Sequence, residues 1–268
     1  MHQTDLSLAE KMNLQCPAII ANQCDRWSTQ QHTYPFGTVR MVSTDTRGVG
    51  INRNLALALA DAEIVLFADD DMVYYDGALQ GVADAFRQLP DADVILFSID
   101  MTRNGEVFDE RRSPIRRLHL WNALKYGTCR MAVRRSALQR SNVWFSTLFG
   151  GGCRYGSGED SLLLCHCFRA GLRVYSHSLV LGRCAKDSST WFSGFNEKFM
   201  FDKGAWIACA FPTCKHLIKW YFIRKFTHKS QLSAKDTAAW VNRGVRAFDA
   251  GLNYDEYLTQ KGRCGDTP

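Results

Sequence analysis

Short apolar runs of strand length recur along the first two thirds of the chain, and each stops on polar or acidic residues. They cover 17–21, 38–42, 64–68 and 93–98. Continuous rather than alternating apolar runs are typical of strands that are buried on both faces of a parallel sheet. Segments of helical length separate them at 52–60 and 77–89. This alternation predicts an α/β fold whose mainly parallel sheet is flanked by helices.

The last third of the chain has a helical pattern instead. A helical segment over 195–226 is interrupted at Pro212, and Ser233 is placed to cap a last helix that ends at Gly251. The change of pattern divides the chain into an α/β domain, a helical extension packed on it and a disordered tail. We predict these three parts over 1–190, 191–260 and 261–268.

Composition narrows the compartment and the partners. The 268 residues include 10 cysteines, residues 1–5 begin no export signal, and no apolar run approaches the roughly 20 residues that span a bilayer. Cysteines without an export signal predict a reducing, cytoplasmic compartment. The net charge of +6 permits an anionic partner. Because the basic residues form no recognised binding motif, we expect no nucleic-acid partner.

Three consecutive acids, Asp69, Asp70 and Asp71, stand where the apolar run 64–68 ends. Ligands bind at the carboxyl ends of strands in parallel sheets, and carboxylates crowded there need a cation or basic partners to stay ionised together. Side chains alternate along a strand, so Asp69 and Asp71 should face one way, toward a metal, and Asp70 the other. A divalent ion with a phosphorylated ligand is one interpretation of the acids, and a solvated acidic turn is the other.

A second acidic pair follows a glycine-rich loop at 149–158. Glu159 and Asp160 begin a predicted helix that continues to about Ala170. Ser157 and Asp160 have the spacing of a capping box, and acids are favoured at a helix N-terminus by the helix dipole. Alternatively, a carboxylate here serves as a general base, because the glycines leave room for a substrate. Both interpretations hold if one acid caps the helix while its neighbour faces a cleft.

The segment 47–54 joins a strand to a helix and offers backbone N–H groups and Arg53 to a phosphate. Gly48 and Gly50 also half-match a dinucleotide-binding fingerprint. However, Arg53 stands where the third glycine belongs, and the acids at 69–71 would repel a cofactor that carries two phosphates. An NAD-dependent dehydrogenase is therefore a weak alternative.

Taken in order, these motifs resemble family 2 glycosyltransferases of the GT-A fold. The landmarks, at suitable separations, are Gly50-x-x-Arg53-Asn54, then Asp69-x-Asp71, then Gly158-Glu159-Asp160-x-x-Leu163. The resemblance covers about residues 18–180, and it implies a Rossmann-like mixed, mainly parallel sheet with a helical C-terminal extension. Segments 22–26 and 47–50 are similar to a bacterial capsule or exopolysaccharide subgroup of that family.

The resemblance implies an inverting transfer of a sugar from a nucleotide diphosphate, a UDP-sugar, to a saccharide or lipid-linked glycan acceptor. Asp69 and Asp71 occupy the positions that bind Mn²⁺ or Mg²⁺ on the donor diphosphate, and Asp69 would also lie near the ribose. Asp160 matches the catalytic base, and Glu159 precedes it. The base would deprotonate the acceptor hydroxyl, which then attacks the anomeric carbon.

The same resemblance assigns further residues to the donor. Gly50, Arg53 and Asp70 would lie near the nucleotide. In this family an acid after the first strand contacts the base of the nucleotide, and here Gln23 or Asp25 would take its place. The donor site is therefore expected at the ends of the strands that precede these residues.

One departure from the family concerns the start of the chain. The family opens with an apolar strand that helps to form the nucleotide pocket. Met1 stands where that strand should already have ended. We expect the true start of the protein to lie upstream of Met1.

The stretch 215–226 mixes lysines, arginines and aromatic residues. It fits an interfacial helix at an anionic membrane, with snorkelling cations, on the inner face of the cell membrane. Such a location would suit a lipid-linked acceptor. The stretch also fits a core-packing helix with a solvated basic face. A membrane-associated partner protein that keeps the fold without turnover is the second function that the sequence leaves open.

Overall fold

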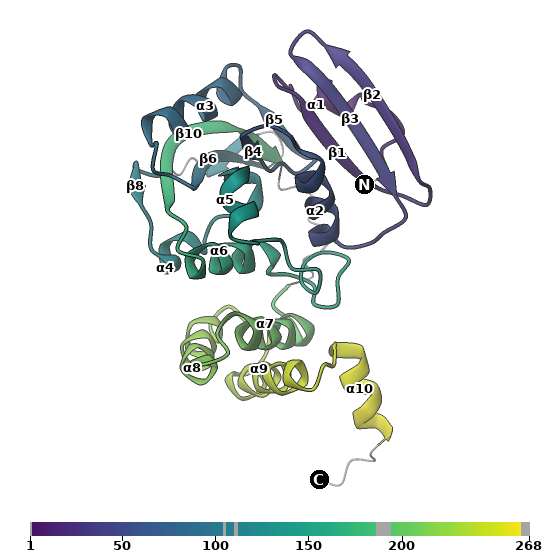
Figure 1. The fold of residues 1–268 in the computed structure, drawn as a ribbon. Helices are drawn as coiled ribbons and strands as arrows, with labels where there is room; N and C mark the ends of the chain where they lie inside the picture. Colours follow the sequence, from purple (N-terminus) through teal and green to yellow (C-terminus); the bar gives the residue numbers. More distant parts are fainter. Residues whose placement is uncertain (1, 104–105, 110–111, 186–193, 264–268) are drawn as a thin grey trace. The chain divides into compact units, whose positions relative to one another are not determined.

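The computed structural model of the protein describes residues 2–103, 106–109, 112–185 and 194–263. The chain forms two compact units (Figure 1). The first unit comprises Met1–Phe145 and Leu163–Ser189, and the second comprises Ser146–Leu162 and Thr190–Pro268. The domain boundaries predicted at 190 and 260 stay predictions.

Two β-sheets form in the first unit. The smaller sheet has the order β1-β3-β2, with β1 (Ala18–Gln23), β2 (Ser28–Tyr34) and β3 (Gly37–Thr44). The larger sheet follows the path β4-β9-β6-β10-β5, with β7 on β6 and β8 on β10. Its strands are β4 (Ile64–Leu66), β5 (Met72–Tyr74), β6 (Val94–Arg103), β7 (Glu106–Asp109), β8 (Arg116–Arg117), β9 (Met131–Arg134) and β10 (Val174–Ala185).

The mixed sheet and its flanking helices confirm the predicted α/β class, but the direction of most strands differs from the prediction. Among the described strand pairs, β1–β3 and β6–β10 are parallel, and the others are antiparallel. The expectation of a mainly parallel sheet assumed helical crossovers between strands that are adjacent in sequence. Instead, β9 comes late in the chain and inserts between β4 and β6, antiparallel to both.

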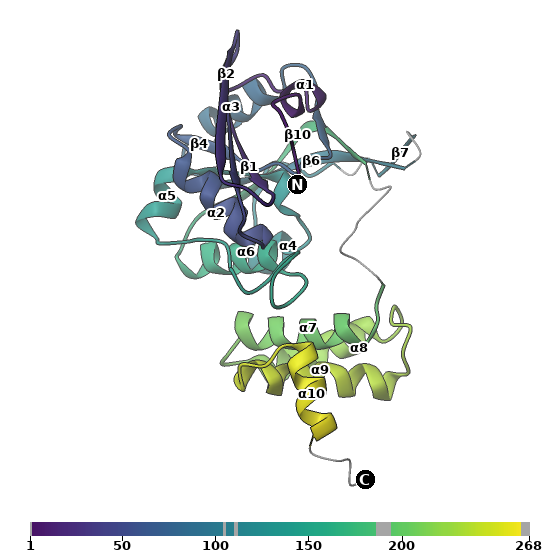
Figure 2. The same ribbon diagram turned by 90° about the vertical axis from the view of Figure 1, so that its right-hand side faces the viewer.

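Helices cover both faces of the larger sheet, with α1 and α3 on one face and α5 and α6 on the other (Figures 1 and 2). Ile95 and Phe97 of β6 join the core cluster on the α1 and α3 side, whereas Val94 and Leu96 join the cluster on the other side. This alternation is the two-residue period of a strand. The helices of the first unit are α1 (Leu8–Lys11), α2 (Val49–Leu59), α3 (Ala78–Gln88), α4 (Leu120–Ala123), η1 (Thr128–Arg130), α5 (Arg135–Arg140) and, from Leu163 onward, α6 (Glu159–Arg169).

β1 and β4 are each the end strand of their sheet within the described residues. Near the end of β1, the His2 backbone N–H donates to the Gln23 carbonyl at 3.1 Å. The Asn22 side chain also exchanges hydrogen bonds of 2.9 Å with the backbone of Gln3. The first described residues therefore lie beside the end of β1, and the upstream start of the chain stays a prediction.

The second unit is helical, with α7 (Glu197–Ala210), α8 (Lys215–Phe226), α9 (Ala234–Asp249) and α10 (Tyr254–Arg263). The predicted cap at Ser233 is confirmed, because its side chain accepts a hydrogen bond from the Asp236 N–H at 3.1 Å. The sequence predicts no helix after Gly251, whereas α10 follows it and overlaps the start of the predicted tail. Residues 264–268 of that tail lie outside the described residues. No helix in the described part of the chain combines the length and apolar character needed to cross a membrane.

α7 and α9 pack closely because a glycine lies on each side of their contact. A Cβ added at Gly204 would come within 2.2 Å of the Val241 carbonyl oxygen. A Cβ added at Gly244 would come within 1.9 Å of the Phe201 carbonyl oxygen. Both obstacles are backbone atoms, which cannot move aside as a flexible side chain can. The absence of side chains at these two positions therefore sets the distance between the helices.

Candidate active site

The three consecutive acids form the turn between β4 and β5. The Met72 N–H donates to the Asp69 carbonyl at 3.2 Å, which closes the turn. Asp69 is half-buried, and Asp70 and Asp71 are exposed. The prediction that Asp69 and Asp71 face one way because strand side chains alternate is therefore wrong in its reasoning, since the acids follow the strand and lie in a turn.

The surroundings of Asp71 in this turn favour its protonated form. Partial desolvation, and then the Asp69 carboxylate, raise the pKa of Asp71, while a hydrogen bond with Cys184 opposes the change. Cys184 lies on β10 directly opposite Met72. Burial and the nearby Asp71 carboxylate raise the pKa of the Cys184 thiol to about 12, so the thiol keeps its proton at neutral pH. Asp69 and Asp71 are thus close enough to repel each other.

Arg53 connects α2 to the acidic turn. Its Nη2 lies 2.7 Å from the Asp69 Oδ1, and the Arg53 side chain is only 13% exposed. The guanidinium carbon lies 5.5 Å from the centre of the Phe145 ring. The next residue, Asn54, exchanges hydrogen bonds of 2.9 and 3.0 Å with the Phe145 backbone. Arg53 therefore places a cation beside the acids, and Asn54 fixes the backbone of Phe145, whose ring lies near the Arg53 guanidinium.

The end of β1 and the start of α2 hold further residues that the sequence assigns to the donor. Gln23 is buried, and its side-chain amide donates to the Gly48 carbonyl at 3.0 Å. Gly48 precedes α2 with a φ of +117°, a conformation that favours glycine. Gly50 is buried in the first turn of α2. Gln23 therefore ties β1 to the start of this helix.

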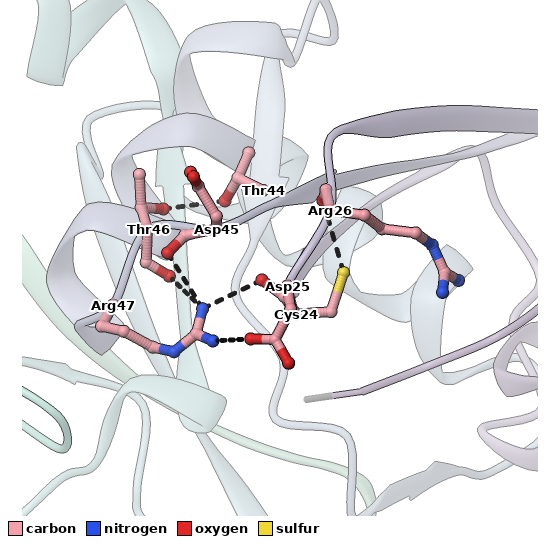
Figure 3. Close-up of polar contacts among 7 residues, drawn as sticks. All are labelled: Cys24, Asp25, Arg26, Thr44, Asp45, Thr46 and Arg47. Atoms are coloured by element: carbon pink, nitrogen blue, oxygen red, sulfur yellow. Dashed lines mark hydrogen bonds and ion pairs between the residues drawn. The ribbon is translucent and has the colours of Figure 1, made fainter.

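Arg47 holds Asp25 just after the end of β1 (Figure 3). The Asp25 side chain is 87% exposed and forms an ion pair with the Arg47 guanidinium. Arg47 also donates to the carbonyl oxygens of Cys24 and Asp45, both at 3.0 Å. Of the two residues predicted to contact the nucleotide base, Asp25 is the accessible one, whereas the Gln23 amide is engaged within the fold.

The carboxylates of the turn fit a divalent cation only when a ligand completes its coordination. Within the described residues, no group of three or more His, Cys, Asp or Glu side chains is arranged to hold a metal ion. Mg²⁺-type ions, however, bind through one or two carboxylates together with substrate phosphates. Asp69 and Asp71 supply such a pair. Desolvation, and then the Asp69 carboxylate, raise the pKa of Asp71, and a cation would relieve the second of these effects.

Glu159 and Asp160 begin α6, at the end of the glycine-rich loop. The Glu159 carboxylate accepts a hydrogen bond from the Gly158 N–H at 3.2 Å, and the Asp160 carboxylate accepts one from the Ser161 N–H at 2.6 Å. Gly158 has a φ of +114°, and a Cβ there would come within 2.5 Å of the Trp206 ring. Glycine at this position therefore permits the close approach of Trp206 to the start of α6.

Three residues of α7, Asp202, Lys203 and Trp206, lie near the start of α6, and the sequence analysis did not identify them. Lys203 packs with its Nζ 5.3 Å from the Phe199 ring centre and 5.9 Å from that of Trp206. Burial lowers the pKa of Lys203, and the carboxylates of Asp160, Glu159 and Asp202 oppose this shift. The signal that could have found them is an Asp-Lys pair, Asp202-Lys203, inside an otherwise apolar helical run.

Two buried polar atoms in the same region have unused hydrogen-bonding capacity. Asp202 is 4% exposed, and its Oδ2 accepts from the Gly156 N–H and from the Lys198 Nζ. Its Oδ1 and the Trp206 Nε1 have no hydrogen-bond partner among the described residues. Buried polar atoms are normally satisfied, so this pair marks a position where a polar ligand or water would be stabilised.

A further polar cluster, also missed, lies on β6 in the first unit. Asp100 is 6% exposed and accepts hydrogen bonds from the Tyr75 hydroxyl at 2.8 Å and from Arg112 at 2.7 Å. Burial and the hydrogen bond to Asp100 raise the pKa of Tyr75. No local pattern marks Asp100, because it lies within a long strand and its partners come from other segments.

The predicted site residues thus divide between the two units. The first unit brings together Arg53, Asp69 and Asp71, and the second contains Glu159 and Asp160. That the two acidic sets converge on one cleft stays a prediction.

Comparison with known proteins identifies the family. The sequence model described as glycosyl transferase family 2 matches residues 7–146, which is just over half of the chain. The chain therefore belongs to glycosyl transferase family 2. No curated protein sequence matches the chain significantly.

Solved structures show the same fold at low sequence identity. The crystal structure of S. aureus TarS 1–349 in complex with UDP-GlcNAc matches with a TM-score of 0.51 and 18% identity, over 81% of this chain and 61% of that one. TarS 1–349 in complex with UDP matches with a TM-score of 0.48 and 18% identity, over 83% of this chain and 61% of that one. The chain therefore spans less than two thirds of the length of these structures.

The family match and the shared fold confirm the predicted family and the predicted GT-A fold. That this chain transfers a sugar stays a prediction. The assignment to a capsule or exopolysaccharide subgroup stays a prediction.

Replacement of Asp71 by asparagine should stabilise the metal-free protein at neutral pH. The fold raises the pKa of Asp71, so the ionised carboxylate destabilises the folded state, and this loss grows as pH rises through the raised pKa. Asp71→Asn should therefore raise the apparent Tm in a chelator at neutral pH and leave it unchanged at low pH. Differential scanning calorimetry checks this, with the exposed Asp61→Asn as control. A lower Tm for Asp71→Asn than for Asp61→Asn at neutral pH would contradict the assignment.

Proposed function

We propose that the protein is a metal-dependent, inverting glycosyltransferase that uses a nucleotide-diphosphate sugar, a UDP-sugar, as its donor. The observation that carries this proposal is the crowding of Asp69 and Asp71 in the β4–β5 turn beside the Arg53 cation. A carboxylate whose pKa is raised by desolvation and by a neighbouring carboxylate, as that of Asp71 is, marks a candidate functional site. Membership of glycosyl transferase family 2 supports the choice of a sugar donor.

On the donor side, Asp69 and Asp71 would hold Mn²⁺ or Mg²⁺. When bound, such an ion neutralises a diphosphate and stabilises it as a leaving group. Arg53, already paired with Asp69, would shift toward a donor oxygen without a large movement. Gly50 and the exposed Asp70 would line the same side, and Asp25, more accessible than Gln23, would contact the base. TarS in complex with UDP-GlcNAc supports a UDP-sugar as donor.

In the transfer step, Asp160 takes the proton of the acceptor hydroxyl, and Glu159 shapes the start of α6 around it. The acceptor oxygen forms a bond to the anomeric carbon as the bond from that carbon to the diphosphate oxygen breaks. One displacement from the face opposite the leaving group inverts the configuration. The proton remains on Asp160 until solvent removes it, and the nucleoside diphosphate leaves with the electron pair.

Lys203 would position the acceptor side of the reaction. The lysine lies on α7 against Trp206, which in turn contacts the loop immediately before Glu159. A cation beside carboxylates favours their ionised form, which a general base requires before it can accept a proton.

The acceptor would be a glycan or a lipid-linked glycan of a surface polysaccharide. The support for a lipid-linked acceptor is α8, which carries exposed aromatic residues among basic ones. Contact between this helix and a membrane would bring the enzyme to such an acceptor.

Donor binding should require both the metal and Asp71. UDP with Mn²⁺ should raise the Tm of the wild-type protein. The free energy of unfolding should increase by about 2.7 kcal/mol when the ligand is 100-fold above its Kd. UDP with a chelator should raise the Tm much less. Asp71→Ala should abolish the metal-dependent part of the shift, and Asp61→Ala should retain it. Thermal shift with a panel of nucleotides checks this. Stabilisation by NAD rather than by UDP, or an unchanged shift in Asp71→Ala, would contradict the donor assignment.

Replacement of Asp160 by asparagine should separate chemistry from donor binding. The amide cannot accept the proton, so turnover should fall by roughly 10²- to 10⁴-fold while metal-dependent UDP binding remains. The measurement is sugar transfer from a donor panel, paired with the thermal shift. Asp255→Asn, an acid in the first turn of α10 in the same unit, serves as control. Transfer by Asp160→Asn at close to the wild-type rate would rule out the role.

Replacement of Lys203 by methionine should stabilise the folded protein and slow sugar transfer. Burial lowers the pKa of Lys203, so the charged form costs stability at neutral pH, and an apolar side chain of similar length removes this cost. Lys203→Met should therefore raise the apparent Tm and lower kcat, whereas the exposed Lys235→Met should change neither. Calorimetry and initial rates check this. A fall in both Tm and kcat would indicate a purely structural lysine.

A further inference from the structure

One face of α8 is left exposed by the packing of the helical unit. The helix lies beside α7 and α9 (Figures 1 and 2) and contains no fully buried residue. Its packed side includes Phe222 and Phe226, whose rings stack with centroids 4.2 Å apart. Its other side exposes Leu217, Trp220 and Tyr221, at 66%, 60% and 53%. The spacing of these three residues places them on a single helical face.

Two cations lie beside the apolar residues of this face. α8 contains no acidic residue, and its basic residues are Lys215, His216, Lys219, Arg224 and Lys225. The Arg224 guanidinium lies 5.8 Å from the Trp220 ring centre, and the Lys225 Nζ lies 5.8 Å from that of Tyr221. Among these cations, Lys215 forms an ion pair of 2.6 Å with Asp249 of α9. The exposed face therefore combines large aromatic rings with adjacent positive charge.

The charge selects among the partners that could cover this face. A second copy of the chain, related by a two-fold axis, would bring this basic face, which has no acidic residue in α8, against the same face of its partner, and cations would then meet cations. An uncharged apolar partner would cover the rings but leave the cations unpaired. The surface of an anionic bilayer satisfies both, because tryptophan and tyrosine favour the headgroup region and lysine and arginine attract anionic lipids.

We propose that α8 docks the protein on the surface of an anionic lipid bilayer. Leu217, Trp220 and Tyr221 enter the headgroup region, and Arg224 and Lys225, which lie beside the Trp220 and Tyr221 rings, contact lipid phosphates and carboxylates. The helix lies flat on the surface, since its 12 residues span only about 18 Å. This docking goes beyond sugar transfer and does not depend on the proposed chemistry, because it requires neither donor nor metal.

Co-sedimentation of the full chain with lipid vesicles tests the proposal. One set of vesicles contains phosphatidylcholine alone, and the other also contains phosphatidylserine at about a third of the lipid. The first variant is Trp220→Ser/Tyr221→Ser, and the second is Arg224→Ser/Lys225→Ser. Trp27→Ser is the matched control, since Trp27 is 68% exposed and belongs to the first unit. Circular dichroism confirms that each variant is folded, and light scattering records its mass.

The wild-type protein and Trp27→Ser should sediment with the anionic vesicles and not with phosphatidylcholine alone. Arg224→Ser/Lys225→Ser should bind about 25-fold more weakly, at about fivefold for each basic residue, and added salt should weaken wild-type binding. Trp220→Ser/Tyr221→Ser should also lose most of its binding. The proposal is overturned if wild-type protein stays in solution, or if either double variant sediments like wild type. A wild-type dimer that Trp220→Ser/Tyr221→Ser converts to a monomer would overturn it as well, by assigning the face to self-association.

Discussion

The desolvation and mutual repulsion of carboxylates in the β4–β5 turn are the constraint on which the candidate donor site depends. The turn places Asp69 and Asp71 close together at the end of a buried strand, where partial desolvation raises the pKa of Asp71. Arg53 compensates from α2, and its own position depends on Asn54 and the Phe145 backbone. The arrangement keeps one carboxylate paired with a protein cation while its neighbour remains exposed to solvent. Such a turn is stable enough to fold and still gains from a ligand that brings further positive charge.

The second unit shows the same balance with the opposite charge. Lys203 packs beside Phe199 and Trp206, burial lowers its pKa, and the nearby carboxylates oppose this shift. A methionine would pack at this position without that cost, so stability alone does not explain the lysine. In each unit, therefore, an ionisable group whose charged form the fold disfavours, Asp71 in the first and Lys203 in the second, lies beside acids that the family resemblance singles out.

The sequence predicted those features that are encoded locally. The continuous apolar run 93–98 predicted a strand buried on both faces, and β6 indeed divides its side chains between two core clusters. Ser233 predicted a helix start because capping needs only residues within one turn. Strand direction was not predictable in this way, since β9 pairs with β4 and β6 across long separations in sequence.

The candidate site shows the same difference between features that are encoded locally and features that depend on contacts between distant segments. Consecutive acids at 69–71 and the acidic pair after the glycine loop are visible as patterns, and so were the residues of α2 that accompany them. Asp100 and Lys203 carry no pattern of their own, because their significance comes from partners that folding brings to them. The sequence also suggested strand alternation for Asp69 and Asp71, whereas a turn places them.

The glycine contact between α7 and α9 has a consequence for which substitutions this protein can tolerate. Gly204 follows Lys203 directly, and the backbone of α9 rests against it. Any side chain at Gly204 or Gly244 would push α7 outward and carry Lys203 and Trp206 with it. α9 contributes no proposed catalytic group, but a substitution at Gly244 would displace Lys203 and Trp206 and so alter the proposed site. Gly204 and Gly244 should therefore accept as few substitutions as the acids themselves.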